Sequence, residues 1–256
     1  MKPTILTPIT RAALITASML AIGAMDAYAD PGAGDAPTAA EASHVAYKLT
    51  VSNYATQSLH ANDVNLRGNL DNQTGWLGYY KEGPSGFEQV RGGYERIDHA
   101  WIVDVDTSLQ AASHGFLGGA ITATTGETLF GILGYGRTNL KPYANLNFDP
   151  NDAITLGVGW KFQEGSNVSL FAVRDDRVVP GQQNLHLLIH APLQNQQRLT
   201  LDIVHKSGPA DPGQSITGTG VSVTYDWPTL FLRLAYDPKV NFTQEHMTRL
   251  SFGTRF

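Results

Sequence analysis

Two histidines of one predicted hairpin have the residue types needed for proton transfer or metal binding. In the hairpin 184–206, the turn APLQNQ joins two segments with alternating apolar residues. In-register pairing around that turn sets His186 opposite Asp202 and His190 opposite Arg198. A carboxylate beside a histidine can orient a general base or a metal ligand. Catalysis also needs a nucleophile, and this hairpin contains no serine. We therefore prefer a structural role and keep His186 and Asp202 as catalytic candidates.

A further histidine lies in the stretch AASHGFLGG, where Ser113 precedes His114. A serine activated by a histidine is the nucleophile of many hydrolases. Adjacent residues of a β-strand point to opposite faces, so these two side chains would not act as one pair in a strand. His114 remains a residue to test rather than an expected catalytic group.

The composition excludes several classes of site. The chain has no cysteine, so it has neither disulfides nor thiolate metal ligands. The stretches NFDPND and RDDR are rich in carboxylates but lack the spacing of a calcium-binding loop. The formal net charge is −5, whereas nucleic-acid binding calls for a clustered basic face. We therefore expect no metal site, no cofactor and no nucleic-acid partner.

The first 29 residues have the pattern of a secretory signal peptide. Basic residues precede the apolar stretch 12–24, and Ala27-Tyr28-Ala29 fits the small-x-small cleavage pattern. The apolar stretch is shorter than the roughly 20 residues of a membrane-spanning helix. We predict a signal peptide over 1–29, followed by a flexible leader over 30–42 that is rich in Pro, Ala and Gly.

From His44 onward, apolar and polar residues alternate with the period of two that is typical of β-strands. Each alternating segment has roughly the 9–11 residues that a tilted strand needs to cross a membrane. The pattern predicts strands over 44–53, 61–69, 74–81, 86–95, 100–109, 114–123, 127–136, 152–162, 167–174, 184–191, 197–206, 217–226, 229–237 and 247–256. The stretch 137–151 could form another strand, but an even number returns both ends to one rim, so we predict a long loop there.

Residues 43–256 are thus predicted to form one all-β domain, a transmembrane antiparallel up-and-down β-barrel of about 14 strands, with 12 as the alternative. A secreted β-sandwich would show the same alternation, because it buries its apolar faces. Three features favour the membrane barrel. The polar faces combine Gly, Thr and Ser with charges, the connections alternate between short and long, and RLSFGTRF ends on the aromatic Phe256.

The aromatic residues agree with this topology. The four tryptophans fall near the ends of their strands at the rim where both termini meet. Indole prefers the boundary between apolar and polar phases. We predict an aromatic girdle at that rim, formed by Trp76, Trp101, Trp160, Trp227 and Phe256.

The apolar stretch at the N-terminus, the absence of cysteine, the alternating strands and the terminal RLSFGTRF together resemble the Gram-negative outer-membrane β-barrel class, which includes the porins. The resemblance implies signal-peptide-directed export, contact with outer-membrane lipids, and recognition of the C-terminal strand by the barrel-assembly machinery. It also places the leader 30–42 in the periplasm and the long connections outside the cell.

The strand faces that would point inward are rich in charge. Charged side chains are costly against lipid and tolerated around water. The expected lumen-lining residues include Asp104, Asp106, Lys161, Arg198, Asp202, Arg233, Arg249 and Arg255. The two aspartates lie on a different part of the wall from the arginines of the last strands. This separation could create a transverse field or could be ordinary solvation.

Three functions fit these features. The main prediction is a porin-like channel for passive passage of small hydrophilic solutes. The alternatives are a lipid- or lipopolysaccharide-modifying outer-membrane hydrolase, and a closed structural or partner-binding barrel filled by ion pairs. The glycine-rich sector 115–136 could let the loop 137–151 fold inward and narrow a channel, or it could serve barrel curvature alone.

Overall fold

The computed structural model describes residues 45–83, 85–162, 165–210 and 214–256. The predicted signal peptide and leader, residues 1–42, lie outside the described residues. The strands are β1 (Ala46–Ala55), β2 (His60–Leu70), β3 (Gln73–Glu82), β4 (Glu88–Ala100), β5 (Val103–Ala112), β6 (Phe116–Thr125), β7 (Leu129–Thr138), β8 (Ala153–Lys161), β9 (Asn167–Asp175), β10 (Gln183–Pro192), β11 (Arg198–Pro209), β12 (Ser215–Asp226), β13 (Leu230–Pro238) and β14 (His246–Arg255). Short 3₁₀ turns are η1 (Ser113–Gly115), η3 (Gln194–Gln196) and η4 (Val240–Phe242). Within these ranges, every helix is too short or too polar to cross a membrane.

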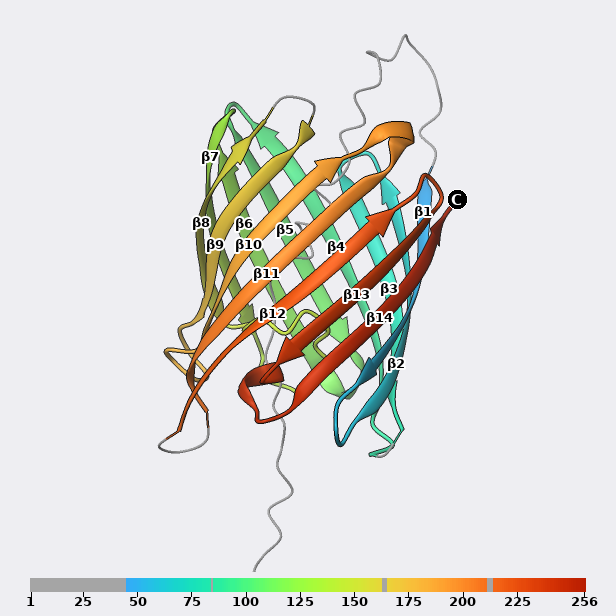
Figure 1. Ribbon diagram of the computed structural model, residues 1–256, viewed down its shortest axis with the longest axis vertical. Coiled ribbons are helices and arrows are strands. Elements are labelled where there is room, and N and C mark those ends of the chain that lie inside the picture. Colours follow the sequence, from blue (N-terminus) through green and yellow to red (C-terminus); the bar gives the residue numbers. More distant parts are fainter. Residues whose placement is uncertain (1–44, 84, 163–164, 211–213) are drawn as a thin grey trace, which may run out of the picture.

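The strands form a closed antiparallel barrel, because each pairs with the next in sequence and β1 pairs with β14 (Figure 1). The prediction of fourteen strands is confirmed, and the alternative of twelve is wrong. At the closure, Lys48 faces Arg255. Beyond this pair, Tyr47 N donates to Phe256 O at 2.8 Å and Phe256 N donates to Tyr47 O at 3.0 Å. The aromatic end of RLSFGTRF is therefore part of the seam that closes the barrel.

The two rims differ in their connections. The terminal rim, where β1 begins and β14 ends, has the connections 71–72, 101–102, 126–128, 162–166, 193–197 and 227–229. The loop rim has the connections 56–59, 83–87, 113–115, 139–152, 176–182, 210–214 and 239–245. The predicted loop over 137–151 is the longest of these. Two loop-rim connections are tied together, because the Ser58 hydroxyl donates to Glu245 Oε1 at 2.5 Å. That hydrogen bond lowers the pKa of Glu245.

Side chains alternate between the two faces of the wall. Along β8, Leu156 on the outside is 59% exposed, whereas the neighbouring Thr155 on the inside is 4% exposed. Leu77 and Leu234 are exposed in the same way on β3 and β13. An outward face this rich in large apolar side chains has no protein to pack against, so it requires an apolar surrounding.

Two of the strands that begin later than the alternation predicts are preceded by a residue with a positive φ. The strand expected over 100–109 begins at Val103, because Trp101 adopts a φ of 60° in the turn before it. The strand expected over 114–123 begins at Phe116, because His114 has a φ of 67° in η1. A positive φ cannot continue an extended strand, and apolar periodicity does not reveal it.

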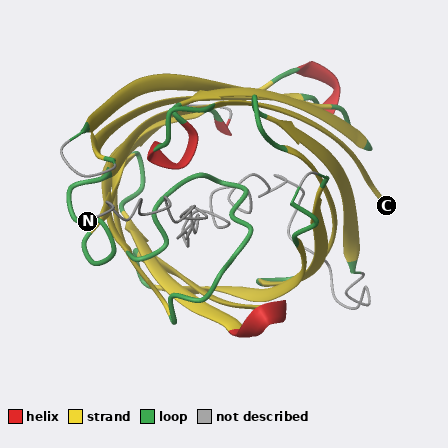
Figure 2. Cartoon of the chain, turned by 90° about the horizontal axis from the view of Figure 1, so that it is seen from below, coloured by secondary structure: helices red, strands yellow, loops and turns green. Residues whose placement is uncertain are grey.

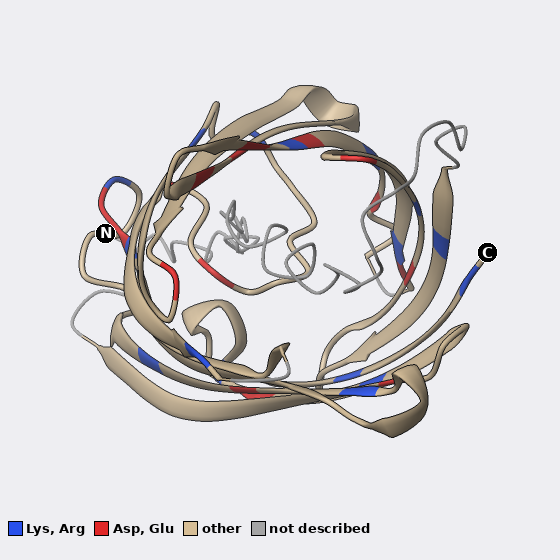
Figure 3. Ribbon diagram, turned by 90° about the horizontal axis from the view of Figure 1, so that it is seen from above, with Lys and Arg blue, Asp and Glu red and all other residues tan. Residues whose placement is uncertain are grey.

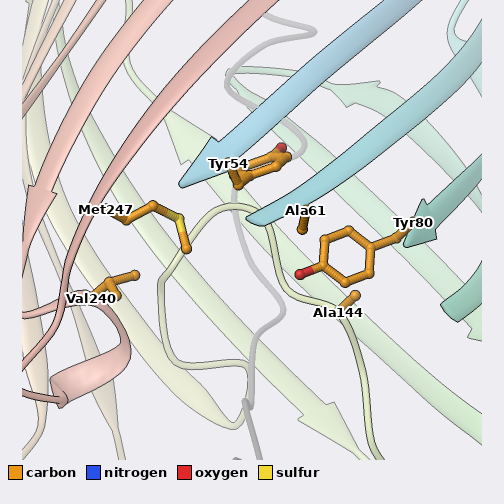
Figure 4. Packing of buried hydrophobic residues seen from close by; sticks show 6 residues of the cluster. All are labelled: Tyr54, Ala61, Tyr80, Ala144, Val240 and Met247. Carbon is orange, nitrogen blue, oxygen red and sulfur yellow. The ribbon is translucent and has the colours of Figure 1, made fainter. Parts of the chain in front are cut away.

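An apolar cluster fills part of the interior near the loop rim (Figure 4). Its buried members come from the four neighbouring strands β14, β1, β2 and β3, from the loop 139–152 and from the last connection. They are Tyr54, Ala61, Tyr80, Ala144, Val240 and Met247. Apolar contacts therefore anchor the loop 139–152 inside the barrel.

Candidate functional site

The loop 139–152, called the inward loop below, lies within the ring of strands rather than outside it (Figure 2). Gln89 of β4 holds one part of it: Gln89 Nε2 donates to Pro142 O at 2.9 Å, and Ala144 N donates to Gln89 Oε1 at 2.7 Å. Arg91 Nη1 donates to Ala144 O at 2.9 Å. Gln89 and Arg91 are almost completely buried. They satisfy the backbone groups that a buried loop would otherwise leave without partners.

Other strands hold the remainder of the inward loop. Arg249 Nη1 of β14 donates to Leu146 O at 2.7 Å. Asn184 Nδ2 of β10 donates to Phe148 O at 3.0 Å and to Asp149 Oδ1 at 2.6 Å. Because β4, β14 and β10 are far apart around the barrel, the loop spans the lumen. It is not confined to the glycine-rich sector 115–136, although Tyr143 stacks on Phe116 there with ring centroids 4.1 Å apart.

His186 clamps the inward loop to the wall. Its Nε2 lies 2.9 Å from Asp149 Oδ1, and its Nδ1 lies 3.2 Å from both carboxylate oxygens of Asp202. The ring also stacks on Phe171 at 4.6 Å and is 4% exposed. Both ring nitrogens therefore face carboxylates, which leaves neither of them open to a substrate. The geometry favours a structural clamp over a general base.

The predicted register of this hairpin is wrong by two residues. His186 faces Val204, and His190 faces Thr200 rather than Arg198. The connection 193–197 has the expected length but is centred one residue later than expected, and it contains η3 with left-handed backbone at Asn195. His186 still contacts Asp202, as a diagonal neighbour on the same face.

His114 and Ser113 do not form a catalytic pair. They lie in η1 at the loop rim rather than in a strand. The Ser113 hydroxyl accepts a hydrogen bond from Val90 N at 3.1 Å, and the His114 ring stacks on Phe87 at 5.7 Å. Both side chains therefore serve the packing of this rim.

Two adjoining cavities occupy the lumen. The larger, of about 670 Å³, extends from Tyr47 and Phe256 at the terminal rim to Tyr143 and Leu146 of the inward loop. The smaller, of about 130 Å³, extends past Asn147 and Asp149 toward Lys206 and Asp237 near the loop rim. The two share the lining residues Asn147, His190, Thr200, Thr224, Arg233 and Arg249. Both cavities border the inward loop, and the smaller one continues the larger one toward the loop rim.

All eight charged residues expected to line the lumen border an interior cavity. Arg198, Arg233, Arg249 and Arg255 line the larger one, and Asp202 lines the smaller one. Asp104, Asp106 and Lys161 line a third cavity of about 50 Å³ against β5 to β10. Their placement follows directly from the period-two alternation.

Several lumen ion pairs join residues that the sequence did not single out as partners. Lys206, fully buried, lies 2.5 Å from Asp237. Asp226 lies between two arginines, Arg198 and Arg255. Arg198 and Asp226 lie on neighbouring strands, whereas the other two pairs reach across an intervening strand, so their detection requires the exact register. The sequence signal available for these five residues was that the alternation places them on the inward face.

Four of the five residues predicted for the aromatic girdle are exposed at the terminal rim. Trp101, Trp160, Trp227 and Phe256 are exposed there, by 86%, 46%, 39% and 69%. Trp76 is the exception, because it lies on the inward face of β3 and lines the larger cavity. Its ring covers Gly93, where a Cβ would come within 2.5 Å of Trp76 Nε1. The prediction considered where Trp76 lies along its strand but not which face of the strand it occupies.

Within the ranges that the structure describes, no group of three or more His, Asp or Glu side chains is arranged to hold a metal ion. The candidate site is thus a charged lumen divided by a loop.

Comparison with known proteins supports the fold. Neither a family model nor a curated protein sequence matches the chain. Among solved structures, the outer membrane protein Omp33 of Acinetobacter baumannii superposes with a TM-score of 0.57 at 9% identity, over 83% of this chain and 98% of that one. A variant of the Rh. blastica porin gives a TM-score of 0.47 at 10% identity over 83% and 99%, and the NanC porin gives 0.45 at 11% over 80% and 98%. The chain thus shares the closed antiparallel β-barrel fold of the outer membrane protein Omp33.

Proposed function

We propose that the protein is a porin-like channel that lets small hydrophilic solutes cross the outer membrane of a Gram-negative bacterium by passive diffusion. The observation that carries this proposal is the pair of adjoining lumen cavities, of about 670 and 130 Å³, which share six lining residues beside the inward loop. A barrel that served only as an anchor would gain stability by filling this volume with side chains. Here the volume is lined by charged residues, which water and polar solutes can solvate.

The inward loop acts as the constriction of this channel. Its backbone is fixed by buried polar side chains from β4, β10 and β14, so it narrows the lumen with a defined shape. The smaller cavity runs beside Asn147 and Asp149, and solutes pass the loop on that side. The size limit for solutes is therefore set by the distance between the loop and the wall formed by β10 to β13.

The proposal includes the direction of insertion. The terminal rim faces the periplasm and carries the aromatic girdle at the lipid boundary, and the C-terminal strand is read by the barrel-assembly machinery. Supporting this are the short connections of that rim and the exposed Trp101, Trp160, Trp227 and Phe256. Export through a cleaved signal peptide over 1–29 remains part of the same proposal.

Swelling of proteoliposomes in isotonic solutions of uncharged sugars tests the channel. Refolded protein should admit small sugars and exclude large ones, whereas heat-denatured protein should admit none. Replacing residues 140–150 by a short Gly–Ser linker should raise the size limit, because it removes the constriction. A folded barrel that excludes even the smallest sugar, with and without the inward loop, would refute the channel.

A further inference from the structure

The charges that line the lumen balance. Around the three interior cavities, the described lining residues include nine Lys or Arg and nine Asp or Glu. Figure 3 shows positions of both signs around the ring of strands. A lining without net charge gives neither anions nor cations a general advantage on entry. Hydrogen bonding and shape are therefore the properties by which this lumen can distinguish solutes.

The carboxylates of the smaller cavity are engaged with other side chains. Lys206 lies 2.5 Å from Asp237, and both residues line this cavity. His186 lies 2.9 Å from Asp149 and 3.2 Å from Asp202. A cationic solute would have to displace one of these partners before it could pair with a carboxylate.

The two arginines of the same cavity are also held by the protein. Arg233 Nε donates to Thr224 Oγ1 at 2.8 Å, and Arg249 Nη1 donates to Leu146 O at 2.7 Å. Together with Lys206, the two arginines balance the three carboxylates of the cavity. The smaller cavity, like the lumen as a whole, therefore offers no excess charge to hold an ion.

Asn147 and Ser222 present uncharged hydrogen-bonding groups to the lumen. Asn147 of the inward loop lines both adjoining cavities, and Ser222 of β12 lines the smaller one. Neither side chain forms a hydrogen bond with another part of the described protein. An amide has donors and an acceptor, and a hydroxyl can do both. The two groups therefore match the hydroxyl groups of a solute, which also donate and accept.

The position of Asn147 is fixed without the use of its own side chain. The carbonyl oxygen of the preceding Leu146 accepts a hydrogen bond from Arg249 of β14. That of the following Phe148 accepts one from Asn184 of β10, at 3.0 Å. Because both neighbours are tied to the wall, the Asn147 amide is held at the cavity before a solute arrives, which lowers the entropic cost of binding.

Phe148 adds an apolar surface to the same cavity. It lines the smaller cavity beside Asn147, and its ring packs edge-on against Tyr54 with centroids 6.3 Å apart. An aromatic surface with a few polar groups that fix orientation is typical of small-molecule sites. The volume of about 130 Å³ has room for about ten water molecules, which is enough for a monosaccharide.

We propose that the smaller cavity is a binding site for uncharged polyhydroxylated solutes of the size of a monosaccharide, in which Asn147 and Ser222 recognise solute hydroxyl groups. The balanced lining sets the solute class, because an ionised analogue would lose hydration without gaining a free counter-charge. A preference of the channel for such solutes rests on the proposed channel function, whereas binding can be measured without conduction.

The first experiment measures binding of glucose to the refolded barrel in detergent by saturation-transfer-difference NMR. Glucuronate and glucosamine, which carry a negative and a positive charge on a similar ring, are the matched probes. Glucose should bind more tightly than either. Asn147→Leu and Ser222→Ala should each weaken glucose binding by about twofold to tenfold, because each removes one neutral hydrogen bond.

The control variant Asn65→Leu makes the same change as Asn147→Leu elsewhere in the lumen. Asn65, on β2, lines the larger cavity and not the smaller one. It should leave glucose binding unchanged. Asn147→Leu should keep the inward loop docked, since the hydrogen bonds to Leu146 O and Phe148 O do not involve the Asn147 side chain. Circular dichroism checks that each variant is folded.

The second experiment measures the reduction of ion current by glucose in a planar bilayer. The reduction should be saturable in the unmodified protein and in Asn65→Leu. The half-saturating glucose concentration should rise by about twofold to tenfold in Asn147→Leu.

The outcomes separate the site from the channel. Glucose binding that depends on Asn147 and Ser222, in a barrel that never conducts, would refute the channel and retain the site. A barrel that conducts but binds no glucose would overturn the site and retain the channel. Tighter binding of glucuronate or glucosamine than of glucose would overturn the solute class. Glucose binding that is unaffected by both Asn147→Leu and Ser222→Ala would overturn the location of the site.

Discussion

Replacing Asp149 by alanine should release the inward loop from the wall. Asp149 is 3% exposed and accepts hydrogen bonds from His186 Nε2 at 2.9 Å and Asn184 Nδ2 at 2.6 Å. A hydrogen bond that involves a charged group contributes about 1.5–3 kcal/mol. A free-energy change of about 1.4 kcal/mol corresponds to a factor of ten in population. Asp149→Ala should therefore raise the population of undocked loop by about tenfold to a hundredfold.

Thiol labelling can measure this population. The chain has no cysteine, so Ala144→Cys introduces one thiol at a loop position that is 7% exposed in the docked state. If labelling proceeds through the undocked loop, its rate follows the undocked population. The rate should rise by about tenfold to a hundredfold when Asp149→Ala is added to Ala144→Cys.

The control removes a carboxylate that is also ion-paired but lies far from the inward loop. Asp98 pairs with Arg96 at 2.7 Å on the exposed face of β4. Asp98→Ala should leave the labelling rate of Ala144→Cys unchanged. Equal labelling rates with and without Asp149→Ala, in barrels that remain folded, would refute the clamp.

Two further predictions test the wall of the barrel. Gly157→Ala should destabilise the barrel by about 1–3 kcal/mol, because the new Cβ would lie 2.3 Å from Phe171 Cβ. In Gly75→Ala the new Cβ meets nothing within 4 Å, so this control should have little effect on stability. Urea unfolding in lipid vesicles measures both variants, and equal stabilities would contradict this packing. Leu156→Arg, on the outward face in the middle of β8, should cost about 2–4 kcal/mol in a bilayer. Leu193→Arg, in the hydrated turn of the terminal rim, should cost about 0–1 kcal/mol, and the reverse order would mean that Leu156 does not face lipid.

The wall could be predicted from sequence because it depends on local alternation. A period of two fixes which residues face inward, so the placement of Asp104, Lys161 and Arg233 at interior cavities followed without any knowledge of the register. The strand number followed from the spacing of turns. Trp76 was misplaced because its distance from the rim was considered without its face.

The clamp could not be predicted in the same way. It depends on the connection 139–152 folding back across the lumen to bring Asp149 to His186, which lie 37 positions apart in the chain. Loop conformation is not encoded in periodicity, and η3 shifts the pairing of His186 by two residues. For Gln89 and Asn184, which hold the inward loop, the sequence indicates only that the side chains face the interior. It does not indicate what they bind.

The measurement that tests the central claim most directly is single-channel current from refolded protein in a planar bilayer, with lipid alone and heat-denatured protein as controls. The proposed channel beside the inward loop predicts discrete, reproducible current steps that grow when residues 140–150 are replaced by a short linker. A barrel that is folded and inserted yet never conducts, with or without the inward loop, would contradict the account and leave a closed barrel.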